Sequence, residues 1–280
     1  MNRAEGRRDR LQAINDELRG QEPDPNSPWL PLESNPDLFS TFARTVGLPE
    51  PWRFEDVLGL EDELLAMVPE ADSCAAVILL FPCTQNIYEA RAREERETRA
   101  FLLAAEGQEG GVSASSSAFF LKQHVEFGNA CGTIASVHAL ANAREIYEAD
   151  GPKDSSTTTS LSDFCEQNKS ANADERGRAL LASHALKFAS DVAAAAPAAQ
   201  TELPDRNGPD LDHHFTAFVR KNGRLLELDG TKLAPVDCGP CLASDSLLRA
   251  AAMAVKERFI STEPDSIEFS LMALVRGNGI

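Results

Sequence analysis

A cysteine near the middle of the chain is a candidate nucleophile. Apolar residues recur at helical spacing after Cys131, which places this thiol near the N-terminus of a predicted helix. The helix dipole and a nearby histidine can lower the pKa of such a thiol to about 3.5–7.5, so that thiolate is present at neutral pH. The alternative for a cysteine in an Ala- and Gly-rich helix start is a small buried core residue.

A histidine and an aspartate downstream could complete a catalytic set. Asn222-Gly223 separates two short apolar-rich runs and predicts a two-residue hairpin turn. Pairing outward from this turn places Asp229 opposite Thr216. Side chains alternate along a strand, so His214 shares the face of Asp229 as a diagonal neighbour roughly 7–8 Å away, whereas His213 points to the other face. Only His214 can therefore meet the Asp229 carboxylate.

The chemistry that these residue types allow is nucleophilic catalysis by a thiol. A carboxylate bonded to one imidazole nitrogen fixes the tautomer and leaves the other nitrogen to take a proton. Cys131 would be the nucleophile, His214 the general base and Asp229 the acid that orients it. A lone histidine beside a strand is more often structural, but the joint pattern in this chain order is rarer than its parts.

The elements that must position these residues mix helices with hairpins, without the regular alternation of a parallel α/β fold. The apolar run 75–81 predicts a buried strand, and 87–106 predicts an exposed helix. A helix capped by Asp245 and an alternating strand over 267–275 are predicted near the end. The remaining predictions are loops at 107–117 and 151–160, mostly helical structure over 161–194, and an irregular loop over 195–211.

Composition limits the class of protein. With 42% hydrophobic and 25% charged residues, the chain is expected to fold around a core. Its 44 acidic and 27 basic residues give a net charge of −17, which disfavours nucleic acid and anionic lipid as partners and favours a basic one. There is neither an apolar signal core nor a long apolar run, and the six cysteines form no dense framework. A cytoplasmic or nuclear protein with free thiols is expected.

The residues around the candidate nucleophile resemble those of a known family. The run FFLKQHVEFGNACGTIASVHALAN (119–142) is similar to the signature of the ubiquitin carboxyl-terminal hydrolases, which are papain-like cysteine peptidases. LDHHFTAFVRKNGRLLELDG (211–230) is similar to that family's histidine strand and aspartate hairpin. Further similarity lies in PWLPLESNPD, ELLAMVPE and LLFPCTQNIYEARAREE, so that the resemblance covers about residues 28–276 and matches the short, single-domain branch.

The resemblance implies an α+β papain-like fold, with a central, mainly antiparallel sheet surrounded by helices and a crossover loop over the active site. It makes Cys131 the nucleophile, His214 the base, Asp229 the orienting acid and Gln123 the oxyanion donor. The family's glutamine precedes its nucleophile by six residues, whereas Gln123 precedes Cys131 by eight. We place the two extra residues within 124–127. His138 also matches the family block, but its expected role is structural.

The implied reaction is hydrolysis of small amides, esters or thioesters at the C-terminal glycine of ubiquitin, through an acyl-enzyme on Cys131. The loop 195–211 would be the crossover loop, which limits the size of the leaving group. Glu33 is a candidate partner for an arginine in the basic tail of ubiquitin; the alternative is a solvated surface glutamate. A ubiquitin-like modifier is a further possible partner, a monomer is expected, and neither a cofactor nor a metal is expected.

The domain expectation is a charged, disordered extension over 1–27, a catalytic domain over 28–276 and a short tail over 277–280. Two alternatives remain open at this stage. The chain could be a ubiquitin-binding module whose catalysis is weakened by the insertion after Gln123. The pair Cys238 and Cys241 has thioredoxin-type spacing, but the chain lacks the fold order that such a redox site needs, and the pair is expected to lie in a loop.

Overall fold

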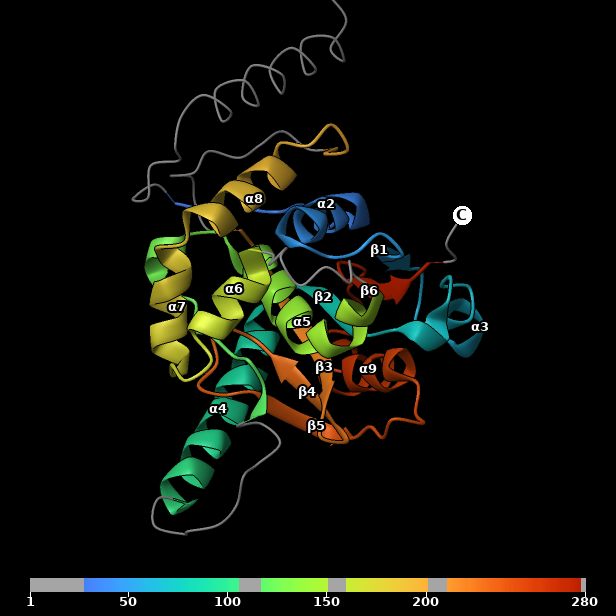
Figure 1. The fold of residues 1–280 in the computed structure, drawn as a ribbon. Helices are drawn as coiled ribbons and strands as arrows, with labels where there is room; N and C mark the ends of the chain where they lie inside the picture. Colours follow the sequence, from blue (N-terminus) through green and yellow to red (C-terminus); the bar gives the residue numbers. More distant parts are fainter. Residues whose placement is uncertain (1–27, 106–116, 151–159, 201–210, 278–280) are drawn as a thin grey trace, which may run out of the picture.

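The computed structural model describes residues 28–105, 117–150, 160–200 and 211–277. This part of the chain forms one six-stranded, wholly antiparallel sheet with strand order β1-β6-β2-β3-β4-β5, flanked by helices (Figure 1). The predicted α+β class with an antiparallel central sheet is confirmed. The elements, with 3₁₀-helices and one π-helix (η5) marked η, are α2 (Pro36–Val46), β1 (Trp52–Val57), α3 (Asp62–Leu65), η1 (Ala71–Ser73), β2 (Ala76–Pro82), α4 (Gln85–Ala105), η3 (Val125–Phe127), α5 (Cys131–Tyr147), η4 (Glu148–Asp150), α6 (Ser160–Gln167), α7 (Ala173–Leu181), α8 (His184–Ala194), β3 (His213–Lys221), β4 (Arg224–Leu228), β5 (Val236–Pro240), α9 (Leu247–Val255), η5 (Lys256–Ile260) and β6 (Ser270–Arg276).

The centre of the sheet is the continuous apolar run that predicted a buried strand. β2 pairs with β3 along one edge and with β6 along the other. Its side chains are buried in a core on each face of the sheet, so no second residue needs to be polar. β6 is also central, between β1 and β2. Its predicted alternation from residue 267 is therefore wrong: Ile267 is 95% exposed before the strand begins, and the strand itself is buried on both faces.

The hairpin of β3 and β4 has the predicted register. Ala217 pairs with Leu228 and Lys221 with Arg224, as pairing outward from Asn222-Gly223 requires. Both turn residues have positive φ, 49° at Asn222 and 73° at Gly223, which is the conformation that a two-residue hairpin turn needs. Asp229 therefore leaves β4 one residue beyond Leu228, at the same end of the sheet as the start of β3.

The two faces of the sheet carry different cores. On one face, α5 packs against the odd-numbered side chains of β3, such as Phe215 and Ala217, and α2 and α8 lie side by side beyond it (Figure 1). On the other face, α9 packs against Val77, Leu79 and Phe218. His214 lies four residues before Phe218 on the same strand, so its side chain points to the same face of the sheet. This is the face on which α9 packs.

Several local predictions need correction. Ser246, not Asp245, caps α9: its hydroxyl accepts from the Arg249 N–H, whereas Asp245 accepts from Leu242. The helical stretch 161–194 is three helices, α6, α7 and α8. β1, β5 and α2 were not predicted. The extension 1–27 and most of the loops predicted at 107–117, 151–160 and 195–211 lie outside the described residues.

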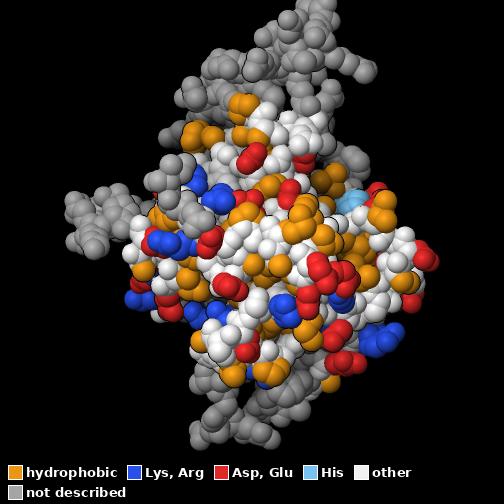
Figure 2. Space-filling model, turned by 90° about the vertical axis from the view of Figure 1, so that its right-hand side faces the viewer, with side chains coloured by type: hydrophobic (Ala, Val, Ile, Leu, Met, Phe, Trp, Pro, Cys, Tyr) orange, Lys and Arg blue, Asp and Glu red, His pale blue; other side chains and the backbone are white. Residues whose placement is uncertain are grey.

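The surface mixes charge types. On the face shown in Figure 2, acidic, basic and hydrophobic side chains are interspersed, so the net charge of −17 is not gathered into one acidic patch there. α4 begins next to the sheet, and its C-terminal part projects from the body (Figure 1). Within the described ranges, no helix has both the length and the apolar character needed to span a bilayer.

Candidate active site

The thiol of Cys131 lies at the first position of α5, as predicted. The residue before it, Ala130, provides no side-chain cap, so the positive end of this 17-residue helix is directed at the thiol. Gly132 lets the helix start pack tightly: a Cβ there would lie 3.2 Å from Leu32 and 3.3 Å from the ring of Phe215. The helix N-terminus is therefore held against β3, close to His214.

His214 and Asp229 meet as the hairpin register predicts. The His214 Nε2 and Asp229 Oδ1 atoms are 2.9 Å apart, and Asp229 is only 1% exposed. The same carboxylate accepts from the Thr231 N–H at 2.9 Å and from the Thr231 hydroxyl at 2.7 Å. The His214 side chain also lies close enough to the Cys131 thiol for the two groups to shift each other's pKa. Since Nε2 faces Asp229, Nδ1 is the nitrogen available to the thiol.

This contact changes the protonation of both groups. Burial would raise the pKa of Cys131, but the proximity and charge of His214, with a hydrogen bond to the backbone of Phe215, outweigh it and lower the pKa. Burial would lower the pKa of His214, but the charge and hydrogen bond of Asp229, together with Cys131, raise it to about 10. The geometry thus favours a thiolate–imidazolium pair near neutral pH.

A group of buried and half-buried charges, which we call the charge cluster, lies behind this pair. Its acidic members are Glu94, Glu227 and Asp229, and its basic members are Arg91, Lys232 and Arg258. Glu227 is fully buried, with Lys232 Nζ at 2.8 Å and Arg258 Nη1 at 2.6 Å. Burial alone would raise the pKa of Glu227, but the charges of Lys232, Arg258 and Arg91 lower it to about 2.

Arg91 links the charge cluster to the candidate catalytic residues. Its Nη2 donates to Asp229 Oδ2 at 2.5 Å, and its Nη1 lies 3.9 Å from Glu227. Burial would raise the pKa of Asp229, but the charges of His214, Arg91 and Lys232, with the His214 hydrogen bond, hold it well below its usual range. Sequence reasoning missed Arg91 and Glu227. Glu227 could have been found, since it lies two residues before Asp229 on the same strand face, among leucines.

Gln123 lies beside the site, and the extra residues before Cys131 are accommodated away from it. The Gln123 N–H donates to the Gly230 carbonyl at 2.9 Å, which fixes this backbone next to Asp229. Gln123 Nε2 lies 3.4 Å from the carbonyl of Gly128 in the segment that leads to the thiol. The intervening residues form η3, in which Val125 is 93% exposed and Phe127 packs on Trp29.

Two other residues singled out in the sequence lie outside the charge cluster. His138 is fully buried, stacks on Phe120 and accepts at Nε2 from the Leu121 N–H, and its burial lowers its pKa to about 4. It therefore has a structural role, as predicted. Glu33 accepts from the backbone N–H of Gln200 at 2.9 Å.

Only the ends of the predicted crossover loop are described. Residues 195–200 and 211 lie within the described ranges, whereas 201–210 do not. At the second end, the Leu211 N–H donates to the side chain of Asn129 at 3.3 Å, and Asn129 is two residues before the candidate nucleophile. This end of the segment is thereby anchored beside Cys131.

The Cys238 and Cys241 pair does not form a redox site of the thioredoxin kind. Both are free thiols, and Cys238 lies in the edge strand β5, not in the predicted loop and not at a helix N-terminus. Burial raises the pKa of Cys238 to about 12, the opposite of the shift that an attacking thiol needs, and Arg258 donates to its sulfur. Within the described ranges, no group of three or more His, Cys, Asp or Glu side chains could hold a metal ion.

Comparisons with known proteins agree on one family. The family model described as "Ubiquitin carboxyl-terminal hydrolase, family 1" matches residues 29–261. A ubiquitin carboxyl-terminal hydrolase from Drosophila melanogaster is 35% identical over 246 residues, covering 88% of this chain and 96% of the relative. Ubiquitin carboxyl-terminal hydrolase isozyme L1 from Homo sapiens is 33% identical over 246 residues, covering 88% and 97% respectively.

Among solved structures, the catalytic domain of Trichinella spiralis UCH37 bound to ubiquitin vinyl methyl ester has a similar fold. The TM-score is 0.63 at 20% identity, and the similarity covers 89% of this chain and 96% of that one. At this level of identity the comparison supports the fold alone.

The first prediction concerns the thiolate. Alkylation of Cys131 by iodoacetamide should stay fast well below about pH 8.5, where an ordinary thiol is mostly protonated, because His214 lowers the Cys131 pKa. His214→Ala should shift the profile to higher pH. The rate at each thiol is measured by mass spectrometry across pH. Cys83 is an internal control, because burial raises its pKa; superimposable profiles for the two thiols would contradict the prediction.

The second prediction concerns Arg91. Arg91→Met leaves Asp229 and Glu227 with one cation fewer, so the Asp229 pKa rises and its hold on His214 weakens. We expect alkylation of Cys131 at mildly acidic pH to slow by about tenfold, the effect of one pKa unit, and stability to fall by about 3–5 kcal/mol.

The matched control is Arg96→Met on the exposed side of the same helix, α4. It should change neither the rate of Cys131 alkylation nor the stability of the protein. Arg91→Lys, which keeps the charge, should recover part of both losses. If a folded Arg91→Met protein were alkylated at Cys131 at the wild-type rate, Arg91 would have no effect on Cys131 and His214.

Proposed function

The chain belongs to the ubiquitin carboxyl-terminal hydrolase family 1, and we propose that its deubiquitinating activity is carried out by Cys131, His214, Asp229 and Gln123. As a member of this family it is a cysteine peptidase that acts on ubiquitin conjugates. The observation that supports the residue assignment best is the hydrogen bond between His214 and the buried Asp229 carboxylate, at the start of the helix that carries Cys131, together with the lowered Cys131 pKa and the raised His214 pKa.

The proposed reaction begins with attack of the Cys131 thiolate on the carbonyl carbon of ubiquitin's C-terminal glycine. The Cys131 N–H and the Gln123 side-chain amide would stabilise the oxyanion. His214 then protonates the leaving amine or alcohol, and afterwards takes a proton from the water that hydrolyses the acyl-enzyme. Asp229 keeps the imidazole oriented throughout. Small amides, esters and thioesters of ubiquitin are the proposed substrates.

Further parts of the proposal concern the extent and the partner of the domain. We place the catalytic domain at residues 28–276, with an extension over 1–27 and a tail over 277–280. The partner is ubiquitin, or a ubiquitin-like modifier, and Glu33 is a candidate contact for an arginine of its tail. We propose that the protein acts as a monomer in the cytoplasm or nucleus. Nucleic acid, which the net charge of −17 repels, is not a proposed partner.

The third prediction tests the nucleophile. Wild-type protein should hydrolyse a ubiquitin C-terminal fluorogenic amide near neutral pH under reducing conditions, and Cys131→Ala should show no turnover, because its side chain cannot form the acyl-enzyme. Cys165→Ala, at a buried thiol on α6, is the matched control and should keep most of the activity. Fluorescence release and covalent capture by ubiquitin vinyl methyl ester are the two measurements.

Three outcomes distinguish the hydrolase hypothesis from its alternatives. Turnover that depends on Cys131 supports the proposal. Ubiquitin binding without turnover would favour the binding-module alternative. Turnover that persists in Cys131→Ala would remove Cys131 from the mechanism.

The fourth prediction tests Gln123. Gln123→Ala should lower kcat by about 10²–10³, the usual cost of one oxyanion donor, and leave KM nearly unchanged. Gly230→Ala should have a smaller effect in the same direction, because the added Cβ would lie 3.0 Å from Gln123 and displace it. Steady-state kinetics on the fluorogenic amide measure both. An unchanged kcat in Gln123→Ala would show that the extra residues in η3 have removed Gln123 from the oxyanion site.

A further inference from the structure

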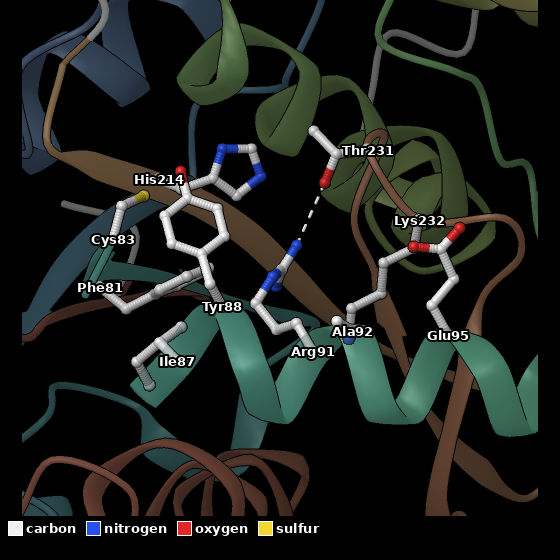
Figure 3. Close-up of a pocket in the computed structure, with 10 residues that line it drawn as sticks. All are labelled: Phe81, Cys83, Ile87, Tyr88, Arg91, Ala92, Glu95, His214, Thr231 and Lys232. Atoms are coloured by element: carbon white, nitrogen blue, oxygen red, sulfur yellow. Dashed lines mark hydrogen bonds between the residues drawn. The ribbon is translucent and has the colours of Figure 1, made fainter. Parts of the chain in front are cut away.

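The surroundings of the candidate active site come from different elements on its two sides. On the side of Asp229, a cavity of about 270 Å³ opens beside His214, between α4 and the end of β2 (Figure 3). Within the part of the chain that the structure describes, neither Cys131 nor Gln123 lines this cavity. The contacts that hold Gln123 lie instead along residues 119–124, which we call the Gln123 segment.

The Gln123 segment runs along α7. The Lys122 N–H donates to the carbonyl of Ala173, the first residue of this helix, at 2.9 Å. Arg176 Nη1 donates to the carbonyl of Phe120 at 3.3 Å. Gly177 lies so close that a Cβ there would be 2.3 Å from the Lys122 carbonyl oxygen. The position of α7 therefore sets the position of the Gln123 segment.

His124 adds a side-chain anchor at the end of this segment. It is the first of the four residues, 124–127, in which we place the two extra residues. Its Nε2 lies 3.1 Å from the carbonyl oxygen of Asp174 in the first turn of α7, and the side chain is 13% exposed. Because a carbonyl oxygen only accepts, Nε2 carries the proton and donates. The hydrogen bond therefore ties the insertion to α7 at the point where the insertion begins.

The insertion is a turn that is closed at its base. Val125 protrudes and is 93% exposed, whereas Phe127 is fully buried. The Phe127 N–H donates to the His124 carbonyl at 3.1 Å, and the two rings are nearly parallel, with centroids 6.5 Å apart. The extra residues thus lie outside the path from Gln123 to Cys131 as long as the base stays closed.

Gln123 reaches across this base. Its Nε2 lies 3.4 Å from the carbonyl oxygen of Gly128, the residue after the turn. In the reaction, the amide must meet the oxyanion together with the Cys131 N–H, and an error of about 1 Å in such an alignment can cost about 10² in rate. Because His124 is the next residue in the chain, any shift of the turn against α7 would also move Gln123.

We propose that His124 is the positioning residue for Gln123. Its hydrogen bond to α7 holds the base of the insertion, so that the Gln123 amide stays directed at the oxyanion although two extra residues precede the nucleophile. The inference rests on the proposed function, in which Gln123 is an oxyanion donor. His124 takes no part in the chemical steps and acts only through Gln123, so the effects of changing the two residues should not be additive.

The test is a double-mutant cycle between the two residues. His124→Phe keeps a ring against Phe127 but has no donor, His124→Leu is a second variant without a donor, and His124→Gln keeps a donor at the reach of Nε2. Each is made in the wild type and in Gln123→Ala. Val125→Ala, which truncates an exposed side chain of the same turn, is the matched control. The measurements are kcat and KM on the ubiquitin fluorogenic amide, with thermal unfolding of every variant.

In the wild-type background, His124→Phe and His124→Leu should lower kcat by about tenfold and leave KM nearly unchanged, because the Gln123 amide is misdirected. His124→Gln should recover most of the lost kcat, and Val125→Ala should match the wild type. In the Gln123→Ala background, the same changes at His124 should have no further effect on kcat, since no amide is left to position.

A role of His124 in stability alone would lower kcat by the same factor in both backgrounds, and this result would overturn the inference. An unchanged kcat in His124→Phe, with Gln123→Ala impaired, would also overturn it while leaving the hydrolase intact. An unchanged kcat in Gln123→Ala would remove the donor itself, and the positioning role with it. Failure of the wild type to turn over the amide would instead overturn the proposed function.

Discussion

The buried carboxylate of Asp229 is the constraint on which the active end of the molecule depends. A carboxylate this well buried must have compensating charges and donors. Asp229 has them from three directions: His214 across the hairpin, Thr231 in the turn that follows, and Arg91 from α4. The hairpin and α4 are far apart in the sequence. Because Asp229 bonds to both, it helps to hold the helix against the sheet.

The same constraint explains the charge cluster beyond Asp229. Arg91 is nearly buried, and a second carboxylate, Glu227, lies within reach of its other nitrogen. Glu227 in turn requires Lys232 and Arg258, which share Glu94. Each charge has a neighbour of opposite sign, and removing one member leaves its buried partners with less compensation, which costs more than an ion pair stabilises. The cluster therefore serves to fix geometry more than to add stability.

Sequence reasoning succeeded where the signal is local. The Asn222-Gly223 turn set the register that joins His214 to Asp229, and the apolar run of β2 marked the central strand. It failed where long-range pairing decides the structure. β5 has no apolar pattern, and it forms a strand because it pairs with the edge of β4. The pair Cys238 and Cys241 was therefore expected in a loop. Arg91 and Glu94 occur in a helix rich in Arg and Glu, where the local pattern does not distinguish inward from outward charges. Only the ion pairs of Arg91 with Glu227 and Asp229, and of Glu94 with Lys232, show which charges of α4 point inward.

The position of α4 also connects the buried ion pair with the surroundings of His214. Arg91 faces Asp229 with its guanidinium, while its neighbours on the same helix face, Ile87 and Tyr88, line the cavity beside His214. A helix that is held in place by a buried ion pair presents these side chains in a fixed position, which a mobile loop could not do. The ion pair between Arg91 and Asp229 thus also fixes one wall of the cavity beside His214. A change in the position of α4 should therefore alter the orientation of the imidazole and the shape of this cavity together.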